Sequence, residues 1–168
     1  MEYRIRPVEP KDAPGLSAVR RMPGVFETIL GNPGENPGKM ETMIAGLGAD
    51  DYFFVAVTPD GQGGELVIGS VSLKVFANPR TRHAAGIGIM VHKDYQNRGI
   101  GRALLQEAVN LADNWLMLIR LELTVFTDNE RAIHLYESMG FQREGIRRKA
   151  AVRNGAYMDE LAMARIRE

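Results

Sequence analysis

The sequence predicts a mixed α/β (α+β) domain, in which a mostly antiparallel sheet of roughly six or seven strands packs against about four helices. Short apolar runs, some alternating with polar residues, recur along the chain and are separated by turn residues. Between residues 84 and 126, a strand-like run is followed by a glycine-rich loop, an amphipathic helix and another strand-like run. Strands joined by a crossover helix are parallel, so this unit gives the otherwise antiparallel sheet one parallel pair.

The composition fits one globular domain covering residues 1–168. Of the 168 residues, 45% are hydrophobic and 25% are charged, and 21 basic side chains balance 21 acidic ones. This neutral chain predicts no nucleic-acid or membrane partner. It contains no cysteine, which excludes disulfides and a thiol nucleophile, and its isolated His92 and His134 predict no metal site. With no apolar leader and no run of about 18 apolar residues, we expect a soluble, cytoplasmic protein.

The first half of the chain is expected to form four strands and two helices. The predicted strands cover residues 3–7, 52–58, 65–76 and 82–91. A turn at Asp60-Gly61 makes the second and third of these an antiparallel hairpin. Asp12, before an Ala-Pro pair, is the predicted N-cap of a helix that ends at residue 20 or 21, and a second helix is expected over residues 39–47. The intervening residues 31–38 are rich in Gly, Asn and Pro, which predicts a loop long enough to be functional.

The second half is expected to form two longer helices and further strands. Helical spacing predicts one buried face formed by Leu104, Leu105, Ala108, Leu111, Ala112 and Trp115. Residues 120–126 alternate as a strand, with Glu122 and Thr124 on the face opposite the leucines. Asp128 or Asn129 is expected to cap the next helix, and Gly140 to follow its end. Finally, residues 141–144 and 150–153 lead into an Asn-Gly turn and a last strand over 156–166.

A glycine-rich loop, Gln96-Asn-Arg-Gly-Ile-Gly101, stands between the strand that ends at Val91 and the following helix. The first N–H groups of a helix lack internal partners and lie at the positive end of its dipole, and glycines let an anion approach them closely. The loop therefore predicts a site for a phosphate compound. Arg102-Ala103 replaces the Lys-Ser/Thr pair of a Walker A loop, and the third glycine of a dinucleotide fingerprint is missing. These departures argue against a nucleoside triphosphatase and against hydride chemistry.

Two segments resemble the Gcn5-related N-acetyltransferase (GNAT) superfamily. Residues 96–101 resemble its pyrophosphate loop, Q/R-x-x-G-x-G/A, and about 28 residues later residues 129–141 resemble its signature N-x-x-A-x-x-L-Y-x-x-x-G-F. The chain looks closer still to bacterial L-amino-acid N-acetyltransferases of YhhY type. This closer resemblance lies in Asn114-Trp115, Asp128-Asn129 and the segments 151–159 and 163–165. The resemblance covers nearly the whole chain from about Arg4 and is weakest over residues 21–50.

The resemblance implies an acetyl-CoA-binding fold with a splayed central parallel pair, whose strands end at Val91 and Phe126. The backbone groups of Met90 and Val91 would bond the pantetheine arm. Asn129 would bond the arm near the thioester, and Tyr136 would point at its sulfur. The backbone amides of the loop and of the residue after it would hold the pyrophosphate, namely those of Gln96, Asn97, Arg98, Gly99, Ile100, Gly101 and Arg102.

Acetyl transfer to an amine needs a neutral nucleophile, a stabilised oxyanion and a proton for the departing thiolate. Tyrosine is protonated at neutral pH, so Tyr136 is the expected general acid. The base stays open, because Gly86 stands where many relatives carry a glutamate. His83, Glu122 and a water chain are the alternatives. Since the chain has no cysteine to form an acyl-enzyme, the transfer is expected to be direct, in a ternary complex.

The preferred function is therefore that of an acetyl-CoA-dependent N-acetyltransferase acting on a small-molecule amine, with a free L-amino acid as the expected acceptor. The segment 22–38 carries the apolar Phe26 and Leu30 and few charges, which suits the closure of a small, partly apolar pocket. Transfer to a protein N-terminus or lysine is the alternative reaction. A non-catalytic acyl-CoA-binding module is the alternative of another class. We also expect a homodimer.

Overall fold

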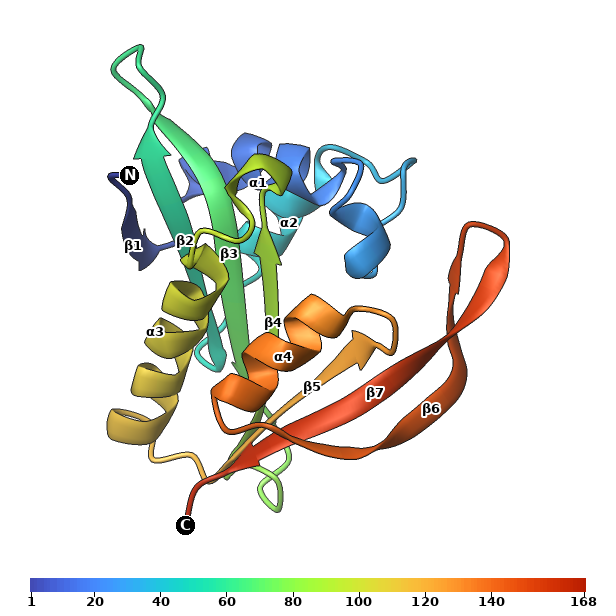
Figure 1. Cartoon of the computed structure of the whole chain (residues 1–168). Helices are drawn as coiled ribbons and strands as arrows, with labels where there is room; N and C mark the ends of the chain where they lie inside the picture. The colour runs from blue at the N-terminus through green and yellow to red at the C-terminus, as the bar shows by residue number, and fades with distance from the viewer.

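The computed structural model describes residues 1–168 and contains one seven-stranded sheet with the order β1-β2-β3-β4-β5-β7-β6 (Figure 1). The strands are β1 (Arg4–Pro7), β2 (Asp51–Pro59), β3 (Glu65–Val75), β4 (Ala84–Val91), β5 (Arg120–Phe126), β6 (Gln142–Arg153) and β7 (Ala156–Ile166). The helices are η1 (Pro10–Asp12), α1 (Ala13–Arg20), η2 (Phe26–Thr28), α2 (Lys39–Ala45), η3 (Lys93–Tyr95), α3 (Ile100–Asn114) and α4 (Glu130–Ser138), of which the η elements are 3-10 helices. The predicted mixed, mostly antiparallel sheet with four α-helices is confirmed.

The central strands β4 and β5 form the predicted parallel pair, but they pair only at one end. Ala84–Gly86 of β4 faces Arg120–Glu122 of β5, and no pairing follows beyond these residues. Figure 1 shows the two strands diverging from there towards their carboxyl ends. Every other neighbouring pair in the sheet is antiparallel. The sheet is therefore split between β4 and β5 along part of their length, and this split connects its two faces.

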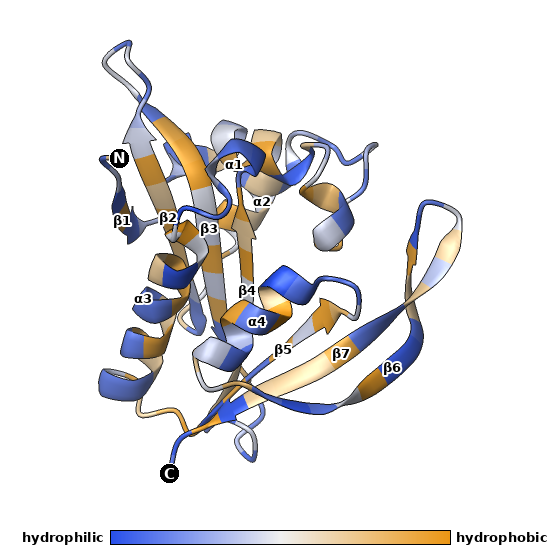
Figure 2. Cartoon of the chain, in the orientation of Figure 1, coloured by the Kyte–Doolittle hydropathy of each residue, from blue (hydrophilic) through white to orange (hydrophobic).

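Helices cover the two faces of the sheet in two layers. On one face, the buried side of α3, which includes Leu104 and Leu105, packs on the central strands together with Ile133 of α4. On the other face, Leu16 of α1 and Met40 of α2 pack on β2 and β3. Burying each such side chain contributes about 1.5–3 kcal/mol to folding. Figure 2 shows that hydrophobic and hydrophilic residues alternate in the helices, because one side of each helix faces the sheet and the other faces solvent. None of the helices has the length and hydropathy needed to span a bilayer.

Two predicted helix ends differ from the structure in detail. Asp12 precedes α1 as predicted, but its carboxylate accepts bonds from Arg6 (2.8 and 2.9 Å) and from the Glu9 N–H (2.7 Å) instead of capping that helix. Trp115, expected on the buried face of α3, follows the end of the helix and is 77% exposed. Because α3 ends at Asn114, Trp115 lies beyond the helix, and the helical spacing does not place its side chain on the buried face.

The C-terminal hairpin also departs from the sequence expectation. Residues 141–144 and 150–153 were expected as separate segments, whereas β6 runs without interruption over residues 142–153. Its pairing with β7 shifts register twice, between Arg143 and Gly145 and between Arg147 and Ala151, and Lys149 has a φ of 51°. These irregularities break the alternation by which a strand is recognised in a sequence. The predicted turn at Asn154-Gly155 is confirmed, with positive φ at both residues.

Candidate functional site

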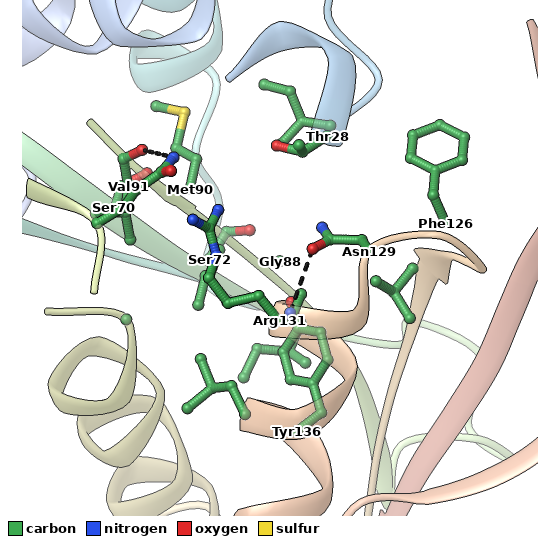
Figure 3. Close-up of a pocket in the computed structure, with 18 of the residues that line it drawn as sticks. Thr28, Ser70, Ser72, Gly88, Met90, Val91, Phe126, Asn129, Arg131 and Tyr136 are labelled. Atoms are coloured by element: carbon green, nitrogen blue, oxygen red, sulfur yellow. Dashed lines mark hydrogen bonds between the residues drawn. The ribbon is translucent and has the colours of Figure 1, made fainter. Parts of the chain in front are cut away.

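A cavity of about 740 Å³ lies where β4 and β5 separate, and residues of both faces of the sheet line it (Figure 3). We call its α3 and α4 side the loop half, which comprises Ile87, Ile89, Val91, Gln96, Asn97, Gly99, Gly101, Arg102, Val125, Asn129, Arg131, Ala132, His134, Leu135 and Tyr136. We call its α1 and α2 side the far half, which comprises Arg20, Thr28, Ile29, Leu30, Met40, Met43, Phe53, Ser70, Ser72, Gly88, Met90, Thr124, Phe126 and Glu160. Nine of the residues expected from the sequence at the site line this one cavity, namely Met90, Val91, Gln96, Asn97, Gly99, Gly101, Arg102, Asn129 and Tyr136.

The edge of β4 is free of a partner strand along the cavity. Two bonds, from Phe76 N–H to the Ala84 carbonyl (3.1 Å) and from His92 N–H to the Ile68 carbonyl (2.9 Å), show that even-numbered residues of β4 pair with β3. Backbone groups alternate along an antiparallel ladder, so those of Ile89 and Val91 point towards β5. Since β5 has already diverged there, the backbone groups of Ile89 and the N–H of Val91 are free to bind a ligand that lies along β4. Met90, expected to offer its backbone, instead faces Ser70 of β3 and contributes its side chain to the cavity.

The glycine-rich loop presents a run of free backbone donors to the cavity. None of the N–H groups from Asn97 to Arg102 donates a hydrogen bond within the protein, and the first helical bond runs from Ala103 N–H to the Gly99 carbonyl (3.0 Å). Gly99 has a φ of 82°, in the left-handed region that favours glycine. These donors lie at the positive end of the α3 dipole, so the loop suits a diphosphate.

The side chains around the loop hold it in place. The Gln96 side-chain amide donates to the Val91 carbonyl (3.1 Å), which ties the loop to the end of β4. A Cβ on Gly101 would lie 3.3 Å from Leu135 and 3.4 Å from Ile89, so the absence of a side chain lets α3 approach α4 and β4 closely. Ile100 is buried in the core, and Arg98 lies over the Tyr95 ring. Neither side chain lines the cavity, so these two residues can act there only through their backbone.

Asn129 and Tyr136 enter the cavity from α4. The Asn129 carboxamide oxygen accepts the Ala132 N–H (3.2 Å, dashed in Figure 3), which caps the helix and leaves its NH₂ group without a partner. The Tyr136 ring is buried beside Phe141, and its hydroxyl makes no hydrogen bond within the protein. Burial raises the pKa of Tyr136 to about 12, because a phenolate would be poorly solvated there. Tyr136 is therefore a neutral hydrogen donor at physiological pH.

The two residues weighed as bases from the sequence lie away from this cavity. His83 is exposed directly before β4, at the end opposite Val91, and its carbonyl accepts the N–H groups of Ile119 (2.9 Å) and Arg120 (3.2 Å). Eight residues of strand separate His83 from Val91 by about 26 Å. Glu122 lies on β5 and forms an ion pair with Arg120 (2.8 Å). Neither residue lines the cavity.

Three charged residues that the sequence reasoning missed line the cavity, namely Arg20 of α1, Arg131 of α4 and Glu160 of β7. Glu160 of β7 is 5% exposed, and one of its carboxylate oxygens accepts a bond from Arg147 (3.0 Å) while the other has no partner within the protein. Arg131 of α4 forms no ion pair and is directed to the cavity beside Asn129 (Figure 3). The signal for Glu160 is a charge on a β7 face that otherwise carries mainly methionine and alanines, which is an unusual position for a carboxylate.

The model of the acetyltransferase (GNAT) family matches residues 26–141. The chain belongs to this family. The L-amino acid N-acetyltransferase AaaT of Escherichia coli (strain K12) is 34% identical over 166 residues, which cover 99% of each chain.

Solved structures share the fold over nearly the whole chain. An acetyltransferase of the GNAT family from Streptococcus pneumoniae superposes with a TM-score of 0.81 and 29% identity, over 98% of this chain and 99% of that one. The spermidine N-acetyltransferase of Vibrio cholerae, in complex with CoA and spermine, has a TM-score of 0.83 and 24% identity, over 98% and 95% of the two chains. At that identity, the second likeness concerns the fold alone.

The protein is thus an acetyl-CoA-dependent N-acetyltransferase, as the sequence resemblance led us to expect. The features of its own cavity fit acetyl-CoA. The free amides of residues 97–102 suit the diphosphate, and the unpaired edge of β4 suits the amide groups of the pantetheine arm. Family members act on small-molecule amine substrates.

Proposed function

We propose that the enzyme transfers the acetyl group of acetyl-CoA to the α-amine of a free L-amino acid, directly and in a ternary complex. One observation carries the proposal: a single cavity passes through the split between β4 and β5, joining the loop half to a far half that contains both apolar and charged side chains. The full-length likeness to an enzyme named L-amino acid N-acetyltransferase supports the same acceptor class.

The loop half would bind the cosubstrate through the backbone. Acetyl-CoA supplies a thioester whose carbonyl carbon an amine can attack. The N–H groups of residues 97–102 would bind its diphosphate, and the backbone groups of Ile89 with the N–H of Val91 would bond the pantetheine arm. The free NH₂ group of Asn129 would donate to the arm near the thioester, as its place at the start of α4 allows. Together these contacts would fix the reactive group at the split in the sheet.

Two side chains would move the protons. Tyr136 holds its proton at neutral pH, and its hydroxyl has no competing partner, so it would donate to the thiolate as the thioester breaks. The unpaired oxygen of Glu160 would accept the proton that the amine loses, directly or through water. His83 and Glu122 do not enter the proposal, because neither lines the cavity.

The acceptor class is tested by the initial rate of thiol release from acetyl-CoA with single free L-amino acids, spermidine and short peptides. We expect saturable rates with one or more free amino acids and much lower kcat/KM values with the other amines. Saturable transfer to spermidine or to peptides, with none to free amino acids, would contradict the proposed acceptor. CoA binding without turnover of any amine would instead indicate a binding module.

We also propose that the enzyme works in the cytoplasm, which a chain without cysteine permits, and as a homodimer. The β6–β7 hairpin supports the second proposal. β6 is an edge strand, and Ile146, Val152 and Tyr157 of the hairpin are exposed apolar side chains. Cell fractionation tests the location. Sedimentation of the wild type and of Tyr157→Lys tests the dimer, which is expected to dissociate in the variant.

A further inference from the structure

Arg20, the last residue of α1, belongs to a charged cluster at the wall of the far half. Its Nε lies 2.7 Å from one carboxylate oxygen of Glu35, and Lys39 Nζ lies 2.9 Å from the other. The Glu35 side chain is 4% exposed, whereas the Arg20 side chain is 22% exposed and lines the cavity. The carboxylate is thus the buried member of the cluster, and Arg20 is the member that faces the acceptor space.

The cluster carries more positive than negative charge. Burial acts to raise the pKa of Glu35, but the contacts with Lys39 and Arg20 outweigh it and hold this pKa below the ordinary value of a glutamate. Glu35 is therefore ionised at neutral pH and supplies one negative charge against two positive ones. A cation surplus next to a partly apolar cavity favours an anion, because the attraction is less screened there than in bulk water.

Arg20 also keeps hydrogen-bond donors free. A guanidinium has five N–H donors in a planar fork. The Arg20 Nε contact with Glu35 is bent away from hydrogen-bond geometry, and one Nη donates to the Leu30 carbonyl at 3.3 Å. The other Nη makes no hydrogen bond within the protein. The contacts with Glu35 and Leu30 hold the guanidinium in place, while donors remain for a ligand with two acceptor oxygens.

We propose that Arg20 binds the α-carboxylate of the acceptor and so makes the enzyme selective for amino acids over amines that lack this group. The proposal rests on the proposed function, which places the acceptor in the far half. A carboxylate is planar and accepts two parallel bonds from one guanidinium. A polyamine would instead bring a second positive charge towards Arg20 and the net positive charge of its cluster. The repulsion would weaken the binding of the polyamine.

The test compares one amino-acid acceptor with its carboxamide, which keeps the amine and the side chain but has no charge at the carboxyl position. In the wild type, kcat/KM is expected to be higher for the acid than for the amide. In Arg20→Gln, kcat/KM for the acid should fall about tenfold to hundredfold, mainly through KM, while the amide should change little. The KM for acetyl-CoA should stay constant in the same variant.

Two further variants separate recognition from damage to the fold. Glu35→Gln removes the buried carboxylate but keeps the charge of Arg20, so the preference for the acid should persist. Arg21→Gln is a matched control, because Arg21 is the adjacent arginine, bonds Ser17 (3.3 Å) and does not line the cavity. It should leave the kinetics of both acceptors unchanged. Thermal unfolding of each variant reports how far the fold is affected.

The outcomes distinguish this inference from the proposed function. If the wild type acetylates amino acids and Arg20→Gln keeps the full preference for the acid, or loses the same factor with acid and amide, Arg20 does not bind the carboxylate. If the wild type acetylates other amines but no free amino acid, the proposed acceptor class itself is wrong. A preference for the acid that disappears in Arg20→Gln alone supports both.

Discussion

The two halves of the cavity are built from different parts of the chain and in different ways. The loop half presents mainly backbone groups, namely the free amides of residues 97–102 and the unpaired edge of β4. The far half presents side chains from several separate elements, including Arg20 of α1, Ser70 of β3 and Glu160 of β7. Backbone groups are present whatever the side chains are, so they can bind a cosubstrate that a whole family uses. An acceptor that differs between members needs side chains, because these can be exchanged without altering the sheet.

The largest expected effect lies where the two halves meet. Tyr136→Phe removes only the hydroxyl that would protonate the thiolate, so kcat should fall about 10²- to 10⁴-fold. The affinity for CoA, measured by calorimetry, should stay within a factor of about three, because the backbone groups of the loop half are intact. Retention of the wild-type kcat would remove Tyr136 from the acid role.

The loop half is tested by a charge placed among its free amides. Gly99→Asp puts a carboxylate next to the expected diphosphate position, and the Kd for CoA should rise about 100-fold. Gly155→Asp is a matched control. Gly155 has nearly the same φ as Gly99, 78° against 82°, and a Cβ at either position meets no atom within 4 Å. Equal losses of CoA affinity in the two variants would show that backbone strain, and not the loop, is responsible.

The far half is tested through its buried carboxylate. Glu160→Gln should lower kcat/KM for the amine about tenfold at neutral pH, because the substituted amide cannot accept its proton. This defect should shrink as the pH rises, since more of the amine is then already neutral. Glu122→Gln is the control on the neighbouring strand and should leave the kinetics nearly unchanged. If Glu122→Gln shows the larger loss, the proton acceptor has been assigned to the wrong strand.

The smallest effect on catalysis is expected at the start of α1, whose far end carries Arg20. Burial acts to raise the pKa of Asp12, but the bonds from Arg6 and the Glu9 N–H lower it overall. Asp12 therefore contributes stability above the pKa of the unfolded chain and loses it as the pH falls through the folded-state pKa.

Asp12→Asn should accordingly lower the free energy of unfolding by about 3 kcal/mol at pH 7, measured by urea denaturation. The difference from the wild type should shrink below about pH 4, while the KM for CoA stays unchanged. A difference independent of pH would mean that the ion pair with Arg6 is not its source.

The contrast between the halves also explains what the sequence could predict. The loop half follows from residues close together in the chain, because the glycine spacing, the N-cap at Asn129 and the stripe of α4 are all local patterns. Which backbone groups of β4 point to β3 and which to β5 depends on how β4 pairs with β3. This pairing turns the backbone groups of Met90 to β3. The placement of His83 and Glu122 outside the cavity likewise depends on where β4 and β5 separate.

The far half depends on contacts between distant segments. Arg20, Ser70 and Glu160 are separated by many residues and meet only when the sheet and α1 are assembled. Of these, Glu160 alone gave a local signal, as a charge on an apolar strand face. The apolar segment before residue 38 was expected to close the acceptor space, and its residues Thr28, Ile29 and Leu30 do line the cavity.

The most direct test of the account is a competition in which the enzyme meets free L-amino acids, spermidine and a short peptide together with acetyl-CoA carrying a labelled acetyl group. Mass spectrometry then shows which amine has received the label. We expect the label on the α-amine of one or a few free amino acids. Label found mainly on spermidine or on the peptide would contradict it.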